Sequence, residues 1–327
     1  MDAATVPAEL AHKADHRNLW LTGVERSDGE SIVFGFRIPD AVRPGIAEYV
    51  EVQRQATHAF AHLQLEVPLG SRAMLSTAEL LIDDRSSSWD VLPRAGRVAV
   101  RANIDDRAAR GVADIDVAIR FIAAPAPSSG PDTLGPPAGG SARSNGIGGS
   151  DGSDADRIGT GRITGKYLPQ RLYDRIRGSA AGGRSAAHSE STAGESTATA
   201  GSTATAGSAT GDGPVRDLPR PGPPAGPVVE ELTVDAENPI LGDHETDHIS
   251  GMVVVCAAER LARQHFPGRG LRGLVTRFLS FIEKSEPAHV VLHESDGRLR
   301  VTVVQRGAPC AQVDGVLDDG EPGEEIR

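Results

Sequence analysis

The stretch PGIAEYVEVQRQATHAFAHLQ, residues 44–64, has the strongest helical pattern in the first half of the chain. Its apolar residues recur on one helical face: Val52, Ala56, Ala59, Phe60 and Leu63. Its polar residues recur on the opposite face: Glu51, Arg54, Gln55, His58 and His62. Taken alone, this polar stripe is typical of the solvated side of a surface helix. In a helix enclosed by a sheet, the stripe would instead lie near an interface between two halves of the protein.

Strand-like alternation surrounds this helix. The runs lie at 18–24, 31–38, 73–82, 97–104 and 113–122. The end of the chain repeats the plan, with a strand at 228–234, a helix at 252–265, strands at 271–281, 288–294 and 298–306, and a possible edge strand at 311–317. Ser295-Asp296-Gly297 between two of these runs is a hairpin signal. One long helix wrapped by a curved antiparallel sheet, occurring twice, predicts an α+β double hotdog.

Low-complexity sequence separates the two blocks. Residues 125–157 are rich in Pro, Gly and Ser, and residues 179–227 are a run of Ala, Gly, Ser and Thr with a Pro-rich end. Such segments bury too little apolar surface to offset the entropy of ordering, so both are predicted to be long disordered linkers. We therefore expect a first repeat at 1–124, a helical island at 158–178, a second repeat at 228–318 and an acidic tail at 319–327.

Composition narrows the functional classes. The chain has 327 residues, a mass of 34.2 kDa and a formal net charge of -11, which disfavours a nucleic-acid surface. Two cysteines, Cys256 and Cys310, make no disulfide framework and fit a reducing compartment. The sequence shows no signal-peptide core and no apolar run of membrane-spanning length. We expect a cytoplasmic protein without a membrane segment.

Residues 238–252 place two histidines and several acids directly before the second helix. The pentapeptide His244-Glu245-Thr246-Asp247-His248 matches the bare HExxH zinc pattern, which requires a helix with both imidazoles on one face. Here it stands between a Gly-Asp turn and a Ser-Gly helix start, which favours a loop. We therefore expect neither a metal site nor a cofactor.

Several stretches together resemble the A-factor synthase (AfsA-like) hotdog proteins. In the first repeat they are Leu10-Ala11-His12-Lys13, Leu21-Thr22-Gly23, Glu51-Val52-Gln53-Arg54-Gln55 and Val67-Pro68-Leu69-Gly70. Residues 168–178 resemble the helix between the two repeats of that family, and residues 238–252 resemble its second-repeat signature. The matching segments occur in the family's order and cover both folded blocks.

The resemblance implies a reaction. Members of this family move a β-ketoacyl chain from an acyl carrier protein to the hydroxyl of dihydroxyacetone phosphate, in the biosynthesis of γ-butyrolactone-type signals. The implied partners are the acyl carrier protein and dihydroxyacetone phosphate, with no nucleic acid and no membrane. A double hotdog is expected as a monomeric pseudo-dimer or as a homodimer.

Site roles follow from this reaction. Glu51 is a candidate base or orienting group, Arg54 a phosphate anchor with Gln55 beside it, and His248 or His244 a proton shuttle. Two further assignments concern the start of the second helix. The backbone N–H groups of Gly251 and Met252 are candidate oxyanion donors, and Asp247 is either catalytic or a helix cap.

The second helix departs from the family. Members tend to carry Glu-Ala-Ala-Arg-Gln where this chain has Cys256-Ala257-Ala258-Glu259-Arg260. Cys256 reads as a small apolar residue. Either the two halves complement each other in a composite site, which we favour, or the second half has lost its chemistry. Two alternatives to the transferase remain: a hotdog thioesterase or dehydratase, and a non-catalytic acyl-binding regulatory protein.

Overall fold

The computed structural model describes residues 5–83, 92–103, 112–124, 156–186, 226–235, 238, 240–241, 247–295 and 297–317, with only the backbone for 179–186. Its helices are η1 (Ala8–Ala11), η2 (His16–Asn18), α1 (Ile46–Gln64), α2 (Gln170–Ala186) and α3 (Gly251–His265). The strands of the first half are β1 (Leu21–Ser27), β2 (Ser31–Arg37), β3 (Arg72–Ile82), β4 (Ala95–Ala102), β5 (Ala113–Ala123) and β6 (Arg157–Leu168). Those of the second half are β7 (Val228–Glu231), β8 (His248–Ile249), β9 (Leu271–Phe278), β10 (Ile282–Glu283), β11 (His289–Ser295), β12 (Arg298–Gln305) and β13 (Ala308–Leu317).

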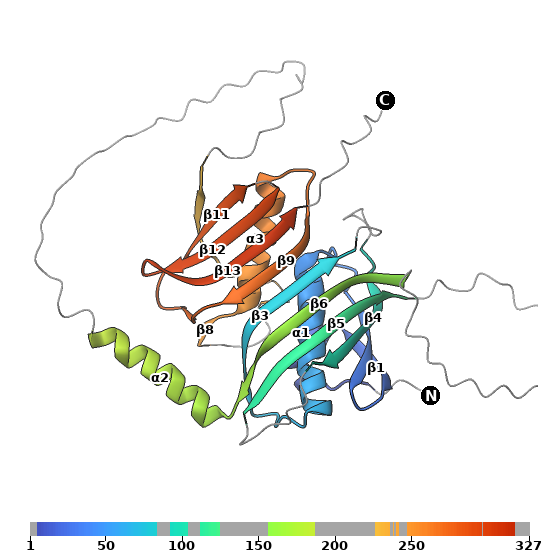
Figure 1. Ribbon diagram of the computed structural model, residues 1–327. Helices are drawn as coiled ribbons and strands as arrows, with labels where there is room; N and C mark the ends of the chain where they lie inside the picture. The colour runs from blue at the N-terminus through green and yellow to red at the C-terminus, as the bar shows by residue number, and fades with distance from the viewer. Residues whose placement is uncertain are drawn as a thin grey trace, which may run out of the picture.

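Eleven of the described strands form one antiparallel sheet in the order β1-β2-β4-β5-β6-β3-β9-β13-β12-β11-β7. The long helices α1 and α3 lie behind this sheet as drawn in Figure 1, each with its own half of the strands curved around it. The fold is therefore a double hotdog, as the sequence predicts. None of the helices in the described part of the chain is long and apolar enough to cross a membrane.

The two halves join through equivalent strands. β3 follows α1, β9 follows α3, and the two strands pair antiparallel with Leu80 opposite Leu274. Counting from the first residue of each helix, Ile46 and Gly251, places Glu51 in register with Cys256 and Arg54 with Glu259. One chain thus builds the pairing that two separate hotdog subunits would otherwise make.

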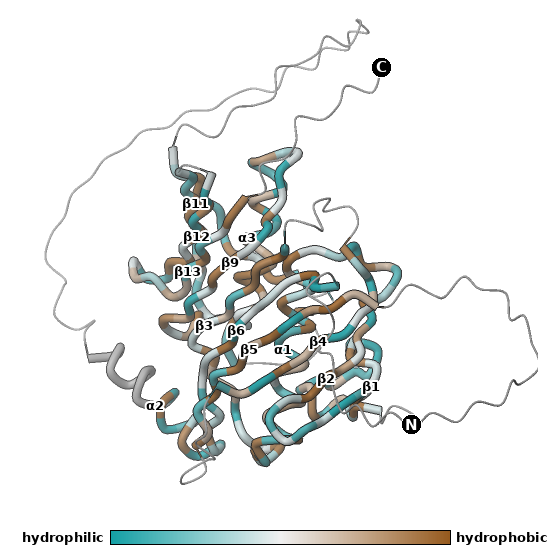
Figure 2. The backbone as a smooth tube through the Cα atoms, turned by 45° about the vertical axis from the view of Figure 1, so that its right-hand side comes forward, coloured by the Kyte–Doolittle hydropathy of each residue, from teal (hydrophilic) through white to brown (hydrophobic). Residues whose placement is uncertain are grey.

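Alternating side chains fix which face of the sheet receives the helices. Along β5, residues Ile115, Val117, Ile119 and Phe121 are buried while their neighbours are more exposed. Phe36 and Tyr49 pack with Phe121 into an aromatic group between α1 and the sheet, with ring centroids 4.9–5.9 Å apart. The alternation of hydrophobic and hydrophilic residues along the strands can be followed in Figure 2.

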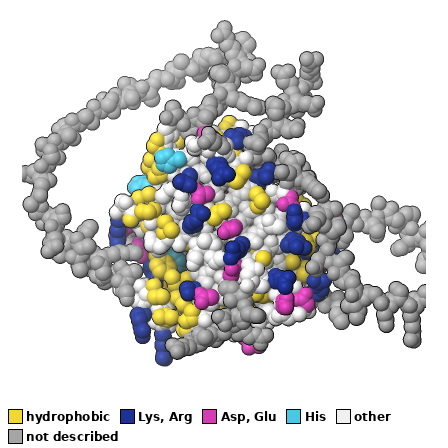
Figure 3. Space-filling model, in the orientation of Figure 1, with side chains coloured by type: hydrophobic (Ala, Val, Ile, Leu, Met, Phe, Trp, Pro, Cys, Tyr) yellow, Lys and Arg dark blue, Asp and Glu magenta, His cyan; other side chains and the backbone are white. Residues whose placement is uncertain are grey.

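The opposite face of the sheet is charged. Figure 3 shows basic and acidic side chains interspersed over it. Cross-strand ion pairs on neighbouring strands include Lys166–Asp114, Arg277–Asp314 and Arg300–Asp314. An antiparallel sheet with one apolar and one polar face fits a single layer of helices.

Several predictions from the sequence need correction. The polar stripe of α1 is not a solvated face, because Glu51, Gln55 and His58 are buried. Residues 311–317 belong to β13, which lies inside the sheet and not at its edge, because β9 and β12 pair on its two sides. The predicted strand at 271–281 ends at Phe278, and Ile282–Glu283 forms a separate short strand.

The segment between the repeats also differs from prediction. Residues 157–168 form β6, which pairs with both β3 and β5, so only the second part of the predicted helical island is helix. α2 then continues to Ala186, into the region predicted as linker. The remaining linker and tail predictions, at 125–155, 187–225 and 319–327, lie outside the described residues.

Candidate functional site

A buried carboxylate occupies the middle of α1. Glu51 has 0% exposure, and its oxygens accept from Lys13 Nζ at 3.0 Å, Arg54 Nε at 2.8 Å and Arg54 Nη2 at 2.9 Å. Gln55 Nε2 adds a fourth donor at 2.9 Å. The structure therefore joins Glu51, Arg54 and Gln55 in one cluster, and it adds Lys13, for which the sequence suggested no role.

The same contacts decide how Glu51 titrates. Burial alone would raise its pKa, but Arg54, Lys13 and the hydrogen bond from Gln55 outweigh burial and lower the pKa to about 2. Glu51 is therefore a carboxylate at any physiological pH and a weak proton acceptor. Its geometry suits an orienting group better than a general base.

Gln55 ties this cluster to the segment that enters β1. Its Oε1 accepts from the backbone N–H of Trp20 at 2.8 Å, and its Nε2 also donates to the carbonyl of Asn18 at 2.9 Å. Arg54 presents a two-pronged contact to Glu51, so Nε and Nη2 are engaged with that carboxylate. A role of Arg54 as phosphate anchor therefore requires other donors of the guanidinium.

Three histidines continue the cluster toward the end of α1. His12 stacks on His58 with ring centroids 4.2 Å apart, and its Nε2 lies 2.8 Å from His62 Nε2. His62 Nδ1 lies 2.6 Å from the carbonyl of Val67, which can only accept, so this nitrogen carries a proton. In neutral His62, Nε2 is then the acceptor and His12 Nε2 the donor. His58 contacts the hydroxyl of the buried Tyr167.

The backbone of His12 explains how its neighbour reaches Glu51. His12 follows η1 in the left-handed region, with φ 53° and ψ 46°, which is uncommon for a residue with a side chain. Its ring contacts hold that conformation, and the chain then turns Lys13 inward. The sequence signal was present, because His12-Lys13 belongs to a family-like stretch, but nothing local to it named Glu51 as the partner.

A second cluster joins Asp247 and His248 to Tyr173 and Arg177 of α2. His248 Nδ1 lies 2.6 Å from Asp247 Oδ1, and the Tyr173 hydroxyl lies 3.3 Å from each of them. Arg177 of α2 donates to Asp247 Oδ2 at 2.9 Å. Asp247 is not the cap of α3, since Ser250 is the N-cap and accepts from the N–H of Met252 at 3.3 Å.

The remaining residues proposed from the sequence stay predictions. His244 lies outside the described residues. The N–H of Met252 is engaged by its own cap, and a Cβ on Gly251 would lie 2.6 Å from the Phe278 ring, which gives that glycine a packing role. Within the described residues, His, Cys, Asp and Glu form no group of three or more that suits a metal ion.

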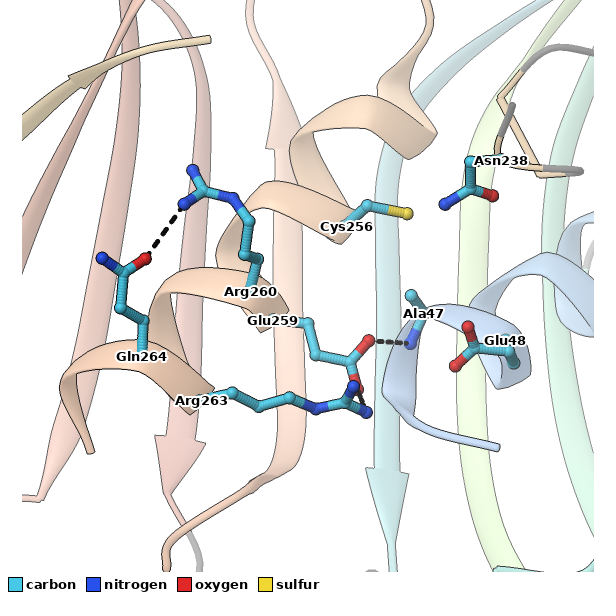
Figure 4. Close-up of a pocket in the computed structure, with 8 residues that line it drawn as sticks. All are labelled: Ala47, Glu48, Asn238, Cys256, Glu259, Arg260, Arg263 and Gln264. Carbon is cyan, nitrogen blue, oxygen red and sulfur yellow. Dashed lines mark hydrogen bonds and ion pairs between the residues drawn. The ribbon is translucent and has the colours of Figure 1, made fainter. Parts of the chain in front are cut away.

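A pocket of about 430 Å³ lies where the start of α1 meets α3 (Figure 4). It is lined by Ala47, Glu48, Asn238, Cys256, Glu259, Arg260, Arg263 and Gln264. Glu259 crosses from the second repeat to cap α1, accepting from the backbone N–H of Ile46 and of Ala47 at 3.1 Å each. Glu259 thus fixes the N-terminus of the helix that carries Glu51.

Glu48 is the residue in this pocket that the sequence analysis missed. Its Oε2 is buried and has no hydrogen-bond partner among the described residues. Burial, followed by the negative charge of Glu259, raises the pKa of Glu48 to about 7. A detectable signal existed, because Glu48 stands one turn before Glu51 on the same stripe.

Cys256 lines the same pocket. Burial, followed by the charge of Glu259, raises the pKa of its thiol well above its usual range. The thiol therefore stays protonated, in keeping with its interpretation as a small apolar residue.

Comparisons with known proteins give structural likeness only. No family model and no curated protein matches the chain. Among solved structures, it is similar to a 12:0-ACP thioesterase from Umbellularia californica, at 10% identity and a TM-score of 0.45, covering 89% of this chain and 98% of that one. An acyl-ACP thioesterase from Bacteroides thetaiotaomicron gives 10% identity and a TM-score of 0.43, with coverages of 88% and 97%.

A tesB protein from Mycobacterium avium subs paratuberculosis gives 9% identity and a TM-score of 0.38, with coverages of 90% and 94%. At these identities and TM-scores the likenesses carry no argument about activity. The fold assignment rests on the strand order and the two enclosed helices described above.

Proposed function

We propose that the chain is an enzyme acting on acyl thioesters, and specifically an acyltransferase. It moves a β-ketoacyl chain from an acyl carrier protein to the hydroxyl of dihydroxyacetone phosphate. One observation carries the proposal: two separate stretches that resemble the A-factor synthase family, residues 10–13 and 51–55, meet at one buried charge cluster through Lys13 and Glu51. Desolvated charges are costly to maintain, and such clusters concentrate at functional sites.

In this proposal Glu51 orients and does not exchange protons. Its low pKa keeps it ionised, so it holds Lys13 and Arg54 in place with their positive charge directed at the site. Arg54, whose side chain is 14% exposed, is the member of the group nearest to solvent, and it is this cluster's candidate for the phosphate of the acceptor.

A second candidate is hydrolysis of an acyl thioester. The observation that favours it is that Arg54 Nε and Nη2 both donate to Glu51. Arg54 therefore has fewer donors to offer a phosphate group. A hydrolase needs no phosphate anchor, since its acceptor is water. The pairing of β3 with β9 inside one chain fits either enzyme as a monomeric pseudo-dimer.

The deciding experiment offers the full chain a β-ketoacyl carrier protein with and without dihydroxyacetone phosphate, with products followed by mass spectrometry. A phosphorylated ester that requires the acceptor, and is lost in Glu51→Gln, supports the transferase. Free β-keto acid at the same rate with and without the acceptor supports the hydrolase. Glu30→Gln, at an exposed carboxylate paired with Arg101, is the matched control. Tight acyl-chain binding without any turnover would reject both and support the non-catalytic alternative.

A further inference from the structure

We propose that the pocket between α1 and α3 receives the acceptor alcohol, with Glu48 taking the hydroxyl proton and Arg260 and Arg263 binding the acceptor's phosphate. This inference rests on the proposed transferase and names the base that the transferase requires. It replaces Arg54 as the phosphate anchor, because Glu51 engages Nε and Nη2 of that guanidinium. It also assigns a role to the second helix, whose sequence departs from the family. The pocket is then a composite of both repeats.

Glu48 lies beside a second carboxylate, that of Glu259, in this pocket. Figure 4 shows its carboxylate directed across the pocket toward Glu259 and Cys256. Glu48 Oε2 and Glu259 Oε1 both lie within 3.0 Å of the point where a Cβ on Gly45 would stand, so the two carboxylates are close neighbours. Like charges this close cannot both be ionised without cost, and the group with fewer donors takes up the proton more readily.

The donors around the pair show which carboxylate that is. Glu259 accepts two backbone N–H groups at the start of α1 and a contact from Arg263 Nη2 at 2.8 Å. Glu48 Oε2 has no partner among the described residues, and the backbone N–H groups of Gly45 and Glu48 and the charge of Arg263 lower its pKa by less than burial and Glu259 raise it. Glu48 is therefore the carboxylate of the pair that gains and loses a proton. Its raised pKa, about 7, agrees with that assignment and suits a general base at neutral pH.

The rim of the pocket supplies positive charge. Arg260 and Arg263 stand one turn apart on α3, and their side chains are 47% and 51% exposed. Each gives part of its guanidinium to neighbouring side chains: Arg260 Nη1 donates to Gln264 and Nη2 to Glu230, and Arg263 Nη2 donates to Glu259. Both remain about half in solvent, where their other donors can meet phosphate oxygens. A cavity of about 430 Å³ has ample room for a phosphorylated triose.

Glu48 accounts for every proton movement in the transfer, and no further reactant is needed. The acceptor oxygen forms a bond to the thioester carbonyl carbon, and its proton passes to the Glu48 carboxylate. The tetrahedral intermediate then collapses, the carbon–sulfur bond breaks, and the leaving thiolate takes the proton from Glu48. The products are the ester and the free thiol, with Glu48 ionised again. The thiol of Cys256 takes no part, since its raised pKa keeps it protonated.

The first test is the pH profile of kcat/KM for the phosphorylated ester. The wild-type rate should fall below about pH 7, where Glu48 becomes protonated and cannot act as a base. Glu48→Gln should lower the rate about 10²- to 10⁴-fold and abolish that acidic limb. The glutamine variant should melt at or above the wild-type temperature, because it removes a buried charge beside Glu259. An active Glu48→Gln that keeps the limb would overturn the inference while leaving the transferase intact.

The second test needs no turnover, so it separates this pocket from the proposed function. Calorimetry with dihydroxyacetone phosphate, and with inorganic phosphate as a probe, should show binding that Arg260→Gln and Arg263→Gln each weaken by about tenfold. Arg101→Gln, at an exposed arginine paired with Glu30, should bind as the wild type does. Equal binding by all four proteins would reject the pocket as the phosphate site. If the wild type transfers nothing yet binds through these arginines, the proposed function fails and the pocket remains.

Discussion

Lys13 Nζ lies 3.0 Å from Glu51 Oε1, and the two side chains are 1% and 0% exposed. Both charges have left water, so the loss of either partner strands the other charge in the interior. Removing one member of a buried pair is therefore far more damaging than the pair's net contribution to stability would suggest.

Lys13→Met should accordingly lower the free energy of unfolding by about 3–5 kcal/mol, measured by urea denaturation. The stem of methionine fills a similar volume, so the missing charge dominates the effect. Lys166→Met is the matched control, since Lys166 pairs with Asp114 on the exposed face of the sheet and both side chains are more than half exposed. Its cost should stay below about 1 kcal/mol. Equal effects of the two substitutions would show that Glu51 does not depend on Lys13.

The stability contributed by Glu51 should depend on pH. Its pKa is lowered in the folded protein from 4.5 to about 2, so the unfolded chain binds a proton first as the pH falls. The stabilisation is fully present above about pH 4.5 and is lost as the pH falls toward 2. The difference in unfolding free energy between wild type and Glu51→Gln should therefore shrink between pH 5 and 3, by an amount on the order of 1–3 kcal/mol. A difference that stays constant over this range would mean that Glu51 has an ordinary pKa.

Gly45 and Glu259 should prove energetically coupled although they belong to different repeats. A Cβ on Gly45 would lie 2.2 Å from Glu259 Oε1, so Gly45→Ala must push the carboxylate away from the N–H groups of Ile46 and Ala47. The φ of Gly45 is -145°, a value open to alanine, so the cause is this clash together with a second one with Arg263 Nη2 at 2.6 Å. Gly45→Ala and Glu259→Ala should each cost about 1–2 kcal/mol, as the loss of a helix cap does.

The double variant separates this coupling from two independent defects. Once Glu259 is gone, alanine at position 45 has no cap to displace, so the double variant should be no less stable than Glu259→Ala alone. Thermal unfolding of the four proteins gives the coupling energy. Additive losses would show that the carboxylate of Glu259 does not cap α1 in solution.

The sequence predicted the fold well because its signals there are periodic. The run 44–64 marks α1 by its apolar spacing, and the plan of strand, helix and strands recurs around α3, so the double hotdog followed. β6 was missed because residues 158–168 were assigned to the helical island between the repeats, and the glycines Gly159, Gly161 and Gly165 interrupt the alternation that would mark a strand. In the sheet each of them has a neighbouring strand backbone within 2.5–2.7 Å of where its Cβ would stand, so the strand needs residues without side chains there.

The candidate site was only partly predictable, since its decisive contacts span the chain. Glu51, Arg54 and Gln55 stand within one turn of each other and were identified together. Lys13 reaches Glu51 through the left-handed turn at His12, and Glu259 reaches Ile46 from the other repeat. Such partners depend on tertiary contacts that no local pattern encodes. Glu48 was overlooked for the same reason, since its raised pKa comes from burial and from Glu259.

The last prediction concerns how α2 is held against the second repeat. Arg177 donates to Asp247 Oδ2 at 2.9 Å and to Glu283 Oε1 and Oε2 at 2.8 and 2.9 Å, and its guanidinium lies 4.5 Å from the centre of the Phe281 ring. The planar guanidinium of Arg177, with its forked donors, can make all of these contacts at once, which the ammonium group of a lysine cannot do. Arg177→Lys should therefore loosen residues 170–178 despite keeping the charge. Amide hydrogen exchange over that segment should become several-fold faster, whereas Arg171→Lys, at an exposed position on the same helix, should leave it unchanged. If both variants exchange as the wild type does, the Arg177 contacts do not hold α2 in place.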